Sequence, residues 1–366
     1  MIFEQEPDIH VWLHTAGEPD TAPCGNGLTM VRNLAIGIRF HWQQSFPSRF
    51  SGKIEGNINT LPVEDYLKSV VGSEMNPKAY PEFLKAHAVI SRSWAVNRIL
   101  HAGTKDDTGR LITDDTIITW EDGADHTGFD VCSDDHCQRY QGMGMASAYP
   151  EETSAAVDAT RGIVLTDDNG HIADARFSKC CGGTTELFST CWQQRDYPYL
   201  VSHPDPYCDL SSMPKEEKEM FLNRAFKGYD RSTGDMSRWE HIVTSEEIHG
   251  RVLAMTKIDI GTVTDLTPLH RGPSGRIDLL EITGTKGSLR LGKELPVRRL
   301  LSLDCLLSSN FNVEKDGDSF RIVGRGWGHG VGLCQTGAAR MACDGARFDE
   351  ILAFYYPHTN LTKIYD

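Results

Sequence analysis

The sequence contains no long apolar run. No stretch approaches 18 consecutive apolar residues, so no transmembrane helix is predicted. The first residues, MIFEQEPDIHVWLH, also lack the basic start and the apolar middle of a secretory signal peptide. We therefore expect either a cytosolic protein or a chain from which an export segment has been removed.

Basic residues are scarce as well. Lys and Arg number 37 against 51 Asp and Glu, which gives a formal net charge of −14 at pH 7. Proteins that bind nucleic acids need basic patches to release counterions, so this balance argues against a nucleic-acid partner. Hydrophobic residues make up 39% of the 366 residues, a share typical of a folded protein with room for one large core or two.

Periodicity predicts an α+β fold. Strands are expected over about 28–61, followed by a helix in PVEDYLKSVVG that begins at Pro62 and ends at Gly72. A longer helix is expected from Pro81 to Gly103, with proline and glycine at the ends where each is favoured.

The remaining segments alternate between polar and strand-like patterns. Residues 104–150 are polar and irregular, 212–252 are polar and helical, and 255–323 read as short strands. We predict central helices packed on mostly antiparallel sheets that are formed from both ends of the chain. The predicted organisation is an N-terminal strand region, 1–52, and a main domain, 53–366, with 212–252 as a polar insertion.

Glu74 is the candidate general acid. It follows Gly72 and precedes a proline, on a short connection beside the apolar Val71 and Met75. Desolvation raises the pKa of a carboxyl group and lets it donate a proton near neutral pH. The alternative is an ordinary solvated loop carboxylate.

Arg92 lies within AVISRSWA, in the middle of the second predicted helix. An arginine on such an apolar face either extends its charged head to solvent or contacts a buried anion.

Residues 126–137, HTGFDVCSDDHC, combine two histidines with two cysteines. His126, Cys132, His136 and Cys137 are soft ligands in a number that suits tetrahedral zinc. Their spacing is not that of a zinc finger, and a Cys132–Cys137 disulfide is the alternative. The nearby aspartates are weaker candidates, because zinc prefers nitrogen and sulfur ligands.

Two glycine-containing stretches are candidates for contact with a ligand. In RFSKCCGGTTELF, a glycine pair follows a predicted strand, and Cys180 and Cys181 are either metal ligands or packed thiols. The stretch GRGWGHGVGLCQTGAARMA lacks the Lys-Ser/Thr of a phosphate-binding loop and the spacing of a dinucleotide site. Its glycines predict a turn that lets His329 and the backbone approach an extended ligand, with Gln335 and Trp327 close to it.

Together these motifs resemble the SpoIID/LytB family of sporulation lytic transglycosylases and amidase enhancers. GWGHGVGLCQTGAARMA resembles the C-terminal signature of the family, and LPVEDYLKSVVGSEMNP with LKAHAVISRSWA resembles its N-terminal half. RGPSGRI and FSKCCGGTTE are also similar to family segments, so the resemblance runs from about Lys53 to Tyr365. The family often has small hydroxyl residues where this chain has Cys180 and Cys181.

The resemblance implies an activity and a set of site residues. It implies a peptidoglycan lytic transglycosylase that cuts MurNAc–GlcNAc bonds to give 1,6-anhydro ends, with Glu74 as general acid and base. Arg92, Tyr199, His329 and Gln335 would bind the glycan strand. The His126, Cys132, His136 and Cys137 group resembles the zinc site of the clostridial branch, where the metal lies beside the catalytic cleft. Because four protein ligands close the shell of the ion, we expect a structural zinc.

Two other functions remain open at this stage. One is a peptidoglycan-binding enhancer of a cell-wall amidase without catalysis of its own, and the other is a zinc-dependent amidase. Each of these readings implies an extracytoplasmic protein, in the periplasm or the cell wall, although the chain shows no export signal.

Overall fold

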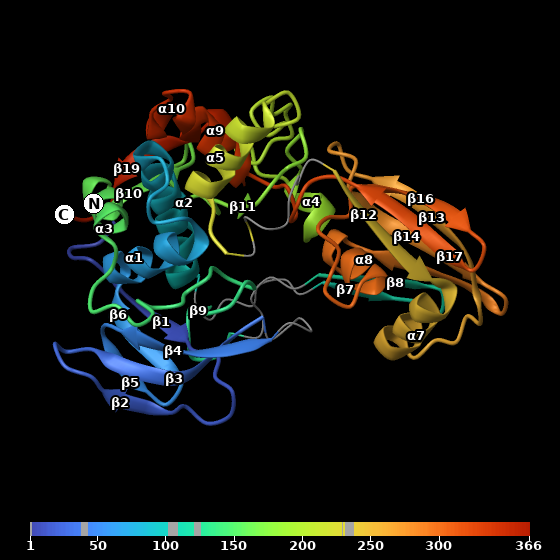
Figure 1. Cartoon of the computed structure of the whole chain (residues 1–366), viewed down its shortest axis with the longest axis horizontal. Helices are drawn as coiled ribbons and strands as arrows, with labels where there is room; N and C mark the ends of the chain where they lie inside the picture. Colours follow the sequence, from blue (N-terminus) through green and yellow to red (C-terminus); the bar gives the residue numbers. More distant parts are fainter. Residues whose placement is uncertain (1, 38–42, 102–108, 121–125, 229, 231–237) are drawn as a thin grey trace.

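The computed structural model describes residues 2–37, 43–101, 109–120, 126–228, 230 and 238–366. The chain forms a helical lobe with small sheets at its base and a second, β-rich lobe (Figure 1). Each lobe has its own hydrophobic core, and the second core is made of residues between Val243 and Ile322. The fold is α+β with mostly antiparallel strand pairs, as the sequence predicts. In the part of the chain that the structure describes, no helix is both long and apolar enough to cross a bilayer.

The base of the helical lobe is formed by the N-terminal strands. One sheet has the order β5-β6-β1-β9 and the other the order β2-β3-β4. The strands are β1 (Asp8–Trp12), β2 (Thr21–Pro23), β3 (Thr29–Ile36), β4 (Gln44–Phe50), β5 (Lys53–Glu55), β6 (Ile58–Pro62) and β9 (Val131–Cys132). β1 precedes the predicted strands, and it pairs antiparallel with β6 and parallel with β9. β1 therefore lies between β6, which leads into the first helix, and the part of the Cys/His segment around Cys132.

The two central helices match the predicted segments, with shifted ends. α1 (Val63–Glu74) continues through Gly72, so Glu74 is the last residue of the helix and not part of a connection. α2 (Pro81–Leu100) starts at the predicted proline, whereas Gly103 and part of the predicted strand at 38–40 lie outside the described residues. The other helices of this lobe are α3 (Glu151–Ala159), α5 (Lys215–Ala225), α9 (Gln335–Cys343) and α10 (Phe348–Tyr355).

The β-rich lobe contains a five-stranded sheet, β13-β14-β15-β8-β7, and a three-stranded sheet, β12-β17-β16. Its strands are β7 (Arg110–Ile112), β8 (Thr116–Thr119), β12 (Trp239–Thr244), β13 (Val263–Arg271), β14 (Ile277–Gly284), β15 (Gly287–Gly292), β16 (Phe311–Asp316) and β17 (Ser319–Gly324). Its helices include α7 (Ser245–Thr256) and α8 (Glu294–Leu301), and α4 (Phe188–Cys191) contacts α8 but buries Phe188 and Cys191 in the core of the helical lobe. The segment 212–252, predicted as a helical insertion, thus also contains β12, a six-residue strand paired with β17.

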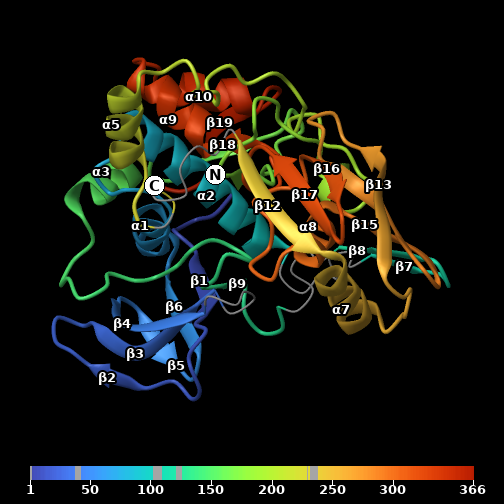
Figure 2. The same cartoon turned by 45° about the vertical axis from the view of Figure 1, so that its right-hand side comes forward.

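Two short strand pairs connect distant parts of the helical lobe. β10 (Ile163–Thr166) pairs with β19 (Asn360–Lys363), and β11 (Phe177–Ser178) pairs in parallel with β18 (Leu333–Cys334). β18 leads directly into α9 in the upper part of the lobe (Figure 2). The glycine-rich stretch before α9 consequently lies beside FSKCC.

Candidate functional site

Glu74 ends α1 with its carboxyl group in a nearly closed environment. The residue is 8% exposed, and Met75, which follows it, is fully buried. Glu74 Oε1 accepts a hydrogen bond of 2.9 Å from the backbone N–H of Arg139. No hydrogen bond to Glu74 Oε2 occurs among the described residues, which leaves this oxygen available to carry a proton.

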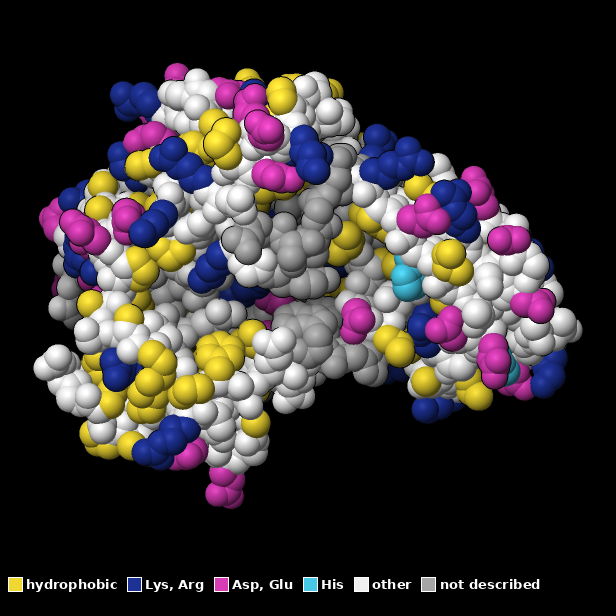
Figure 3. All heavy atoms as spheres, in the orientation of Figure 1, with side chains coloured by type: hydrophobic (Ala, Val, Ile, Leu, Met, Phe, Trp, Pro, Cys, Tyr) yellow, Lys and Arg dark blue, Asp and Glu magenta, His cyan; other side chains and the backbone are white. Residues whose placement is uncertain are grey.

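Charged side chains of both signs surround this carboxyl group. Arg139 donates to Asp135 at 2.5 Å and to Asp230 at 2.9 Å, and the Lys179 ammonium lies 2.8 Å from Asp230 Oδ2. Arg139 and Lys179 are close enough to Glu74 to influence its ionisation. On the face of the molecule drawn in Figure 3, basic and acidic side chains are intermingled.

Burial decides the ionisation of Glu74. Desolvation raises its pKa and outweighs the opposing effects of the charges of Arg139 and Lys179 and of the Arg139 N–H, while Asp135 adds to the rise. Burial also raises the pKa of Asp230, but Lys179 and Arg139 overcome that effect and hold it below its usual value. The two carboxyl groups therefore differ: Glu74 is the one suited to hold a proton near neutral pH.

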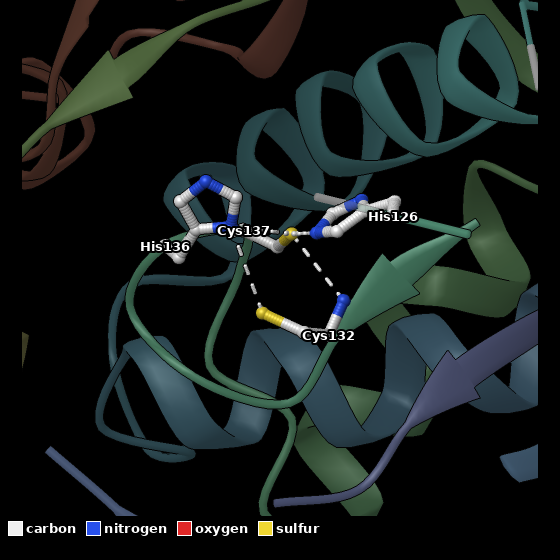
Figure 4. A group of neighbouring side chains, drawn as sticks. All are labelled: His126, Cys132, His136 and Cys137. Atoms are coloured by element: carbon white, nitrogen blue, oxygen red, sulfur yellow. Dashed lines mark hydrogen bonds between the residues drawn. The ribbon is translucent and has the colours of Figure 1, made fainter. Parts of the chain in front are cut away.

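The predicted metal ligands come together beside this carboxyl group. The ligand atoms of His126, Cys132, His136 and Cys137 lie within 4.8 Å of one another and point toward a common centre (Figure 4). Cys137 Sγ is 3.5 Å from His126 Nε2 and 3.6 Å from His136 Nδ1, and Cys132 Sγ is 3.8 Å from His136 Nδ1. Donors about 2.0–2.3 Å from a tetrahedral zinc ion stand about 3.3–3.8 Å apart, so the donor set fits zinc.

The surroundings of this group also suit a metal. His126 Nδ1 lies 3.2 Å from the carbonyl oxygen of Asp130, which can only accept, so Nδ1 carries the proton and Nε2 faces the thiols. The backbone N–H of Cys132 donates to Cys137 Sγ at 3.3 Å. The hydrogen bond from Cys137, against the effect of burial, lowers the pKa of Cys132, with His126 and His136 contributing. Cys132 and Cys137 are free thiols in the structure.

The three neighbouring aspartates are used elsewhere. Asp130 binds His10 at 3.0 Å, Asp134 accepts the backbone N–H of Gly37 at 2.9 Å, and Asp135 pairs with Arg139. The histidines and cysteines alone thus supply the four donors.

The Cys/His group is close in sequence to the residue that donates a hydrogen bond to Glu74. Cys137 is a member of the group, and Arg139 donates its backbone N–H to Glu74. Whatever holds the loop 126–137 in place therefore also holds the hydrogen-bond donor of the candidate acid.

Arg92 does not face a substrate. The residue is fully buried, and its Nε and Nη2 donate to the two carboxylate oxygens of Glu64 at 2.9 and 2.7 Å. Another nitrogen, Nη1, donates to the carbonyl oxygen of Ile163 at 3.0 Å. This corrects the predicted glycan contact: Arg92 meets a buried anion, the second of the two alternatives that the sequence left open.

Tyr199 and Gln335, two more predicted glycan contacts, are buried as well. Tyr199 is 5% exposed, and its hydroxyl oxygen accepts the backbone N–H of Asp174 at 3.1 Å. Gln335 is 2% exposed, and its amide nitrogen lies 3.0 Å from His87 Nε2. Both side chains are thus engaged inside the protein, and neither is presented to a ligand in this structure.

His329, the remaining predicted contact, is half-buried. Its Nδ1 accepts the N–H of Val331 at 3.0 Å, and its ring packs against Trp192 at 5.0 Å between centroids. Burial, followed by Arg176 and Arg276, lowers the pKa of His329 to about 3, so the ring is neutral. A glycan role for His329 stays a prediction.

The glycine-rich turn lies against the protein itself. Gly326, Gly328, Gly330 and Gly332 all have φ between 69° and 88°. A Cβ added to Gly330 would be 2.5 Å from Arg276 Nη1, and one added to Gly332 would be 2.0 Å from the carbonyl oxygen of Arg176. At these positions the glycines are required by close packing with Arg276 and with the segment that leads into β11. That the turn faces a ligand stays a prediction.

Sequence reasoning missed the residues that surround Glu74. Arg139, Lys179 and Asp230 come from three separate segments, and only the fold brings them together. The available signals were local: Arg139 follows a predicted metal ligand by two residues, and Lys179 lies in FSKCCGG.

Comparison with known proteins finds two family models that match parts of the chain. Residues 51–166 match the family described as Stage II sporulation protein (SpoIID), and 186–332 match a domain of unknown function, DUF8618. This part of the chain thus matches the SpoIID family, as its motifs indicate, and the predicted resemblance is confirmed.

Relatives extend this similarity over most of the chain. It is 26% identical over 311 residues to Stage II sporulation protein D of Bacillus subtilis, covering 84% of this chain and 76% of that protein. It is also 26% identical over 319 residues to the amidase enhancer of the same organism, covering 81% of this chain but only 40% of the enhancer. An uncharacterized protein of Brachyspira hyodysenteriae is 29% identical over 299 residues, or 82% of this chain and 66% of that protein.

Proposed function

We propose that the protein is a peptidoglycan lytic transglycosylase in which Glu74 is the general acid and base. The observation that carries the proposal is the environment of Glu74: a carboxyl group that is 8% exposed, has a raised pKa, and holds one oxygen on a backbone N–H while the other accepts no hydrogen bond among the described residues. The match of residues 51–166 to the SpoIID family and the similarity to an amidase enhancer support action on the cell wall. Such a substrate implies an extracytoplasmic location.

One carboxyl group suffices for this reaction. Protonated Glu74 gives its proton to the glycosidic oxygen as the bond from that oxygen to C1 of the MurNAc ring breaks. The Glu74 carboxylate then takes the proton of the C6 hydroxyl group of the same sugar, and the C6 oxygen forms the new bond to C1. Glu74 ends protonated as it began, and the glycan ends in a 1,6-anhydro ring. Because the nucleophile belongs to the substrate, the protein needs no second catalytic carboxylate.

The neighbouring cations fit both halves of this cycle. After the first proton transfer, Arg139 and Lys179 stabilise the Glu74 carboxylate, and burial favours its return to the neutral form. Asp230 stays ionised between Lys179 and Arg139 and so balances their charge.

Zinc is the metal that fits the Cys/His group, and its proposed role is structural. His126, Cys132, His136 and Cys137 would hold the ion through four protein donors, which leaves no open position for a substrate or a water molecule. These four residues would hold the ion, and its binding would fix the loop that leads to Arg139 and hence the hydrogen bond to Glu74. This closed donor set argues against a zinc amidase.

An enhancer of a cell-wall amidase is the second candidate. The similarity to the amidase enhancer favours it, as does the low exposure of Glu74, since an acid must reach its substrate. In this case the protein would bind glycan strands and an amidase without cutting any glycan bond.

The deciding experiment is mass spectrometry of peptidoglycan digests. Purified sacculi, with and without stem peptides, are incubated with the protein or with Glu74→Gln, without added muramidase. Anhydro-ended fragments from the wild type alone would establish the reaction and the role of Glu74. Intact glycan with both proteins, combined with pull-down of peptidoglycan and stimulation of an added amidase, would refute the transglycosylase and establish the enhancer.

A further inference from the structure

A second group of thiols lies in the core of the helical lobe, away from the Cys/His group. Cys180 and Cys181 follow β11, Asp205 and Cys208 lie in the segment after α4, and Cys334 ends β18. These residues come from three stretches of the sequence, and Cys181 and Cys334 are 153 residues apart. All five are between 0% and 2% exposed.

The donor atoms of this group face one another. The sulfur atoms of Cys181, Cys208 and Cys334 and a carboxylate oxygen of Asp205 all lie within 4.8 Å of one another. Cys181 Sγ is 3.2 Å from Asp205 Oδ2, and the sulfur of Cys180 is 3.2 Å from that of Cys208. The separation between Cys181 Sγ and Asp205 Oδ2 is close to that between two ligands of a tetrahedral ion, about 3.3–3.8 Å.

Two backbone N–H groups are directed at one sulfur atom of this group. Cys334 Sγ accepts the backbone N–H of Cys181 at 3.2 Å and that of Gly337, in the first turn of α9, at 3.4 Å. N–H donors directed at sulfur stabilise its ionised form and are common around metal thiolates.

Asp205 is oriented like a ligand. Its Oδ1 accepts the backbone N–H groups of Tyr207 and Cys208 at 3.1 and 3.2 Å, which turns Oδ2 toward the thiols. The Tyr355 hydroxyl donates to Oδ2 at 2.9 Å. A carboxylate in the core needs a cation or a proton, and in the part of the chain that the structure describes no lysine or arginine forms an ion pair with Asp205.

We propose that Cys181, Cys208, Cys334 and Asp205 bind a second divalent metal ion of the zinc class. Three thiolates and a carboxylate form a complete tetrahedral shell for such an ion, and Cys180 packs beside Cys208 as an additional thiol. Simple packing of cysteines as small apolar residues accounts for the thiols. The carboxylate among them accepts hydrogen bonds from Tyr207, Cys208 and Tyr355, but it pairs with no cationic side chain among the described residues. A Cys180–Cys208 disulfide accounts for two of the thiols and leaves Cys181, Cys334 and Asp205 together without a cation.

Such an ion would link three segments that are far apart in the sequence. It would join the end of β11, the 205–208 segment and the start of α9. Lys179, next to Cys180, carries the ammonium group that pairs with Asp230 near Glu74. The second site is thus built to fix this lysine, as the Cys/His group fixes Arg139.

Metal content of the full chain tests the proposal. Cells are grown with added zinc, the protein is purified without strong chelators, and zinc per chain is measured by plasma mass spectrometry. We expect about one equivalent to remain in Cys132→Ser/Cys137→Ser and to be lost when Cys181→Ser/Cys334→Ser is added. The matched control Cys191→Ser/Cys305→Ser changes two cysteines outside both groups and should keep the content of the wild type.

Cobalt provides a second readout that does not depend on variants of the proposed site. Cys132→Ser/Cys137→Ser, refilled with Co²⁺ alone, should show thiolate-to-cobalt charge-transfer absorption, because the site keeps three sulfur ligands. A Cys132→Ser/Cys137→Ser protein without zinc and without this absorption would overturn the proposal. A Cys180–Cys208 disulfide, found by mass spectrometry of the alkylated, unreduced chain, would overturn it as well.

Discussion

A variant of Arg92 can show whether this residue stabilises the core, through its ion pair with Glu64, or contacts glycan. The side chains of these residues are 0% and 3% exposed, and two hydrogen bonds of 2.9 and 2.7 Å join them. Arg92→Met removes the guanidinium group but retains an unbranched side chain. If Arg92 serves the core, this change should lower stability and leave glycan binding of the folded protein intact.

The expected loss follows from what Glu64 retains. Removing one partner of a buried ion pair costs about 3–5 kcal/mol, because the other charge stays buried without compensation. Glu64 Oε1 would keep the Tyr365 hydroxyl at 2.7 Å and the Gly162 N–H at 3.1 Å. We therefore expect a loss near the lower limit, about 3 kcal/mol. The double variant with Glu64→Met should lose less than the sum of the single variants, since it leaves no unpaired charge.

Urea unfolding at pH 7 measures this effect through the midpoint of the transition. An unchanged slope of the unfolding free energy against urea concentration shows that wild type and variant expose the same surface on unfolding. Burial raises the pKa of Glu64, but the combined effect of Arg92, Tyr365 and Gly162 is larger and opposite, so the pKa lies below its usual value. A lowered folded-state pKa stabilises the protein above the unfolded pKa, and this contribution is lost as the pH falls through the folded value. The difference between wild type and Arg92→Met should therefore shrink in acid. Unchanged stability with weakened glycan binding would refute the assignment and restore the predicted substrate role.

Three further predictions concern the site and the glycine-rich turn. Lys179→Gln removes a positive charge that lowers the pKa of Glu74, so the alkaline limit of glycan cleavage should move to higher pH in a pH–rate profile; a downward shift would contradict the proposed acid. Cys137→Ser should lose about one zinc equivalent in metal analysis and reduce cleavage, because the loop that reaches Glu74 loosens; full activity without zinc would contradict the structural role. Gly330→Ala places a Cβ 2.5 Å from Arg276 Nη1 at a φ of 78° and should cost about 1–3 kcal/mol in thermal unfolding, whereas an unchanged transition would contradict the close packing.

The features that could be predicted from the sequence are those encoded locally. The helix periodicity around Tyr66 and the proline at the start of α2 identify both central helices. The four metal-ligand candidates lie within one twelve-residue stretch, so their meeting requires only a compact loop. Glu74 was found through its place in a motif, although α1 extends two residues beyond Gly72.

The features that could not be predicted depend on long-range pairing. Nothing near Arg92 in the sequence shows that Glu64, 28 residues earlier, lies under it. Gln335 meets His87 across 248 residues, and Cys181 meets Cys334 because β11 pairs with β18. A buried polar residue can be recognised from the sequence as needing a partner, but only the tertiary fold shows which partner it has.

The two thiol groups have a common relation to Glu74. Each lies next to one of the cations that oppose the rise of its pKa: Arg139 is two residues after Cys137, and Lys179 is one residue before Cys180. Burial alone would hold Glu74 protonated so firmly that the carboxylate could not form readily, whereas a fully solvated carboxyl group would lose its proton well below neutral pH. An acid that must also act as a base needs a pKa between these limits, so the positions of Arg139 and Lys179 have to be held closely. Rigid, metal-linked attachment of both segments would meet this requirement at a site that lies at the end of one helix and is otherwise bounded by loops.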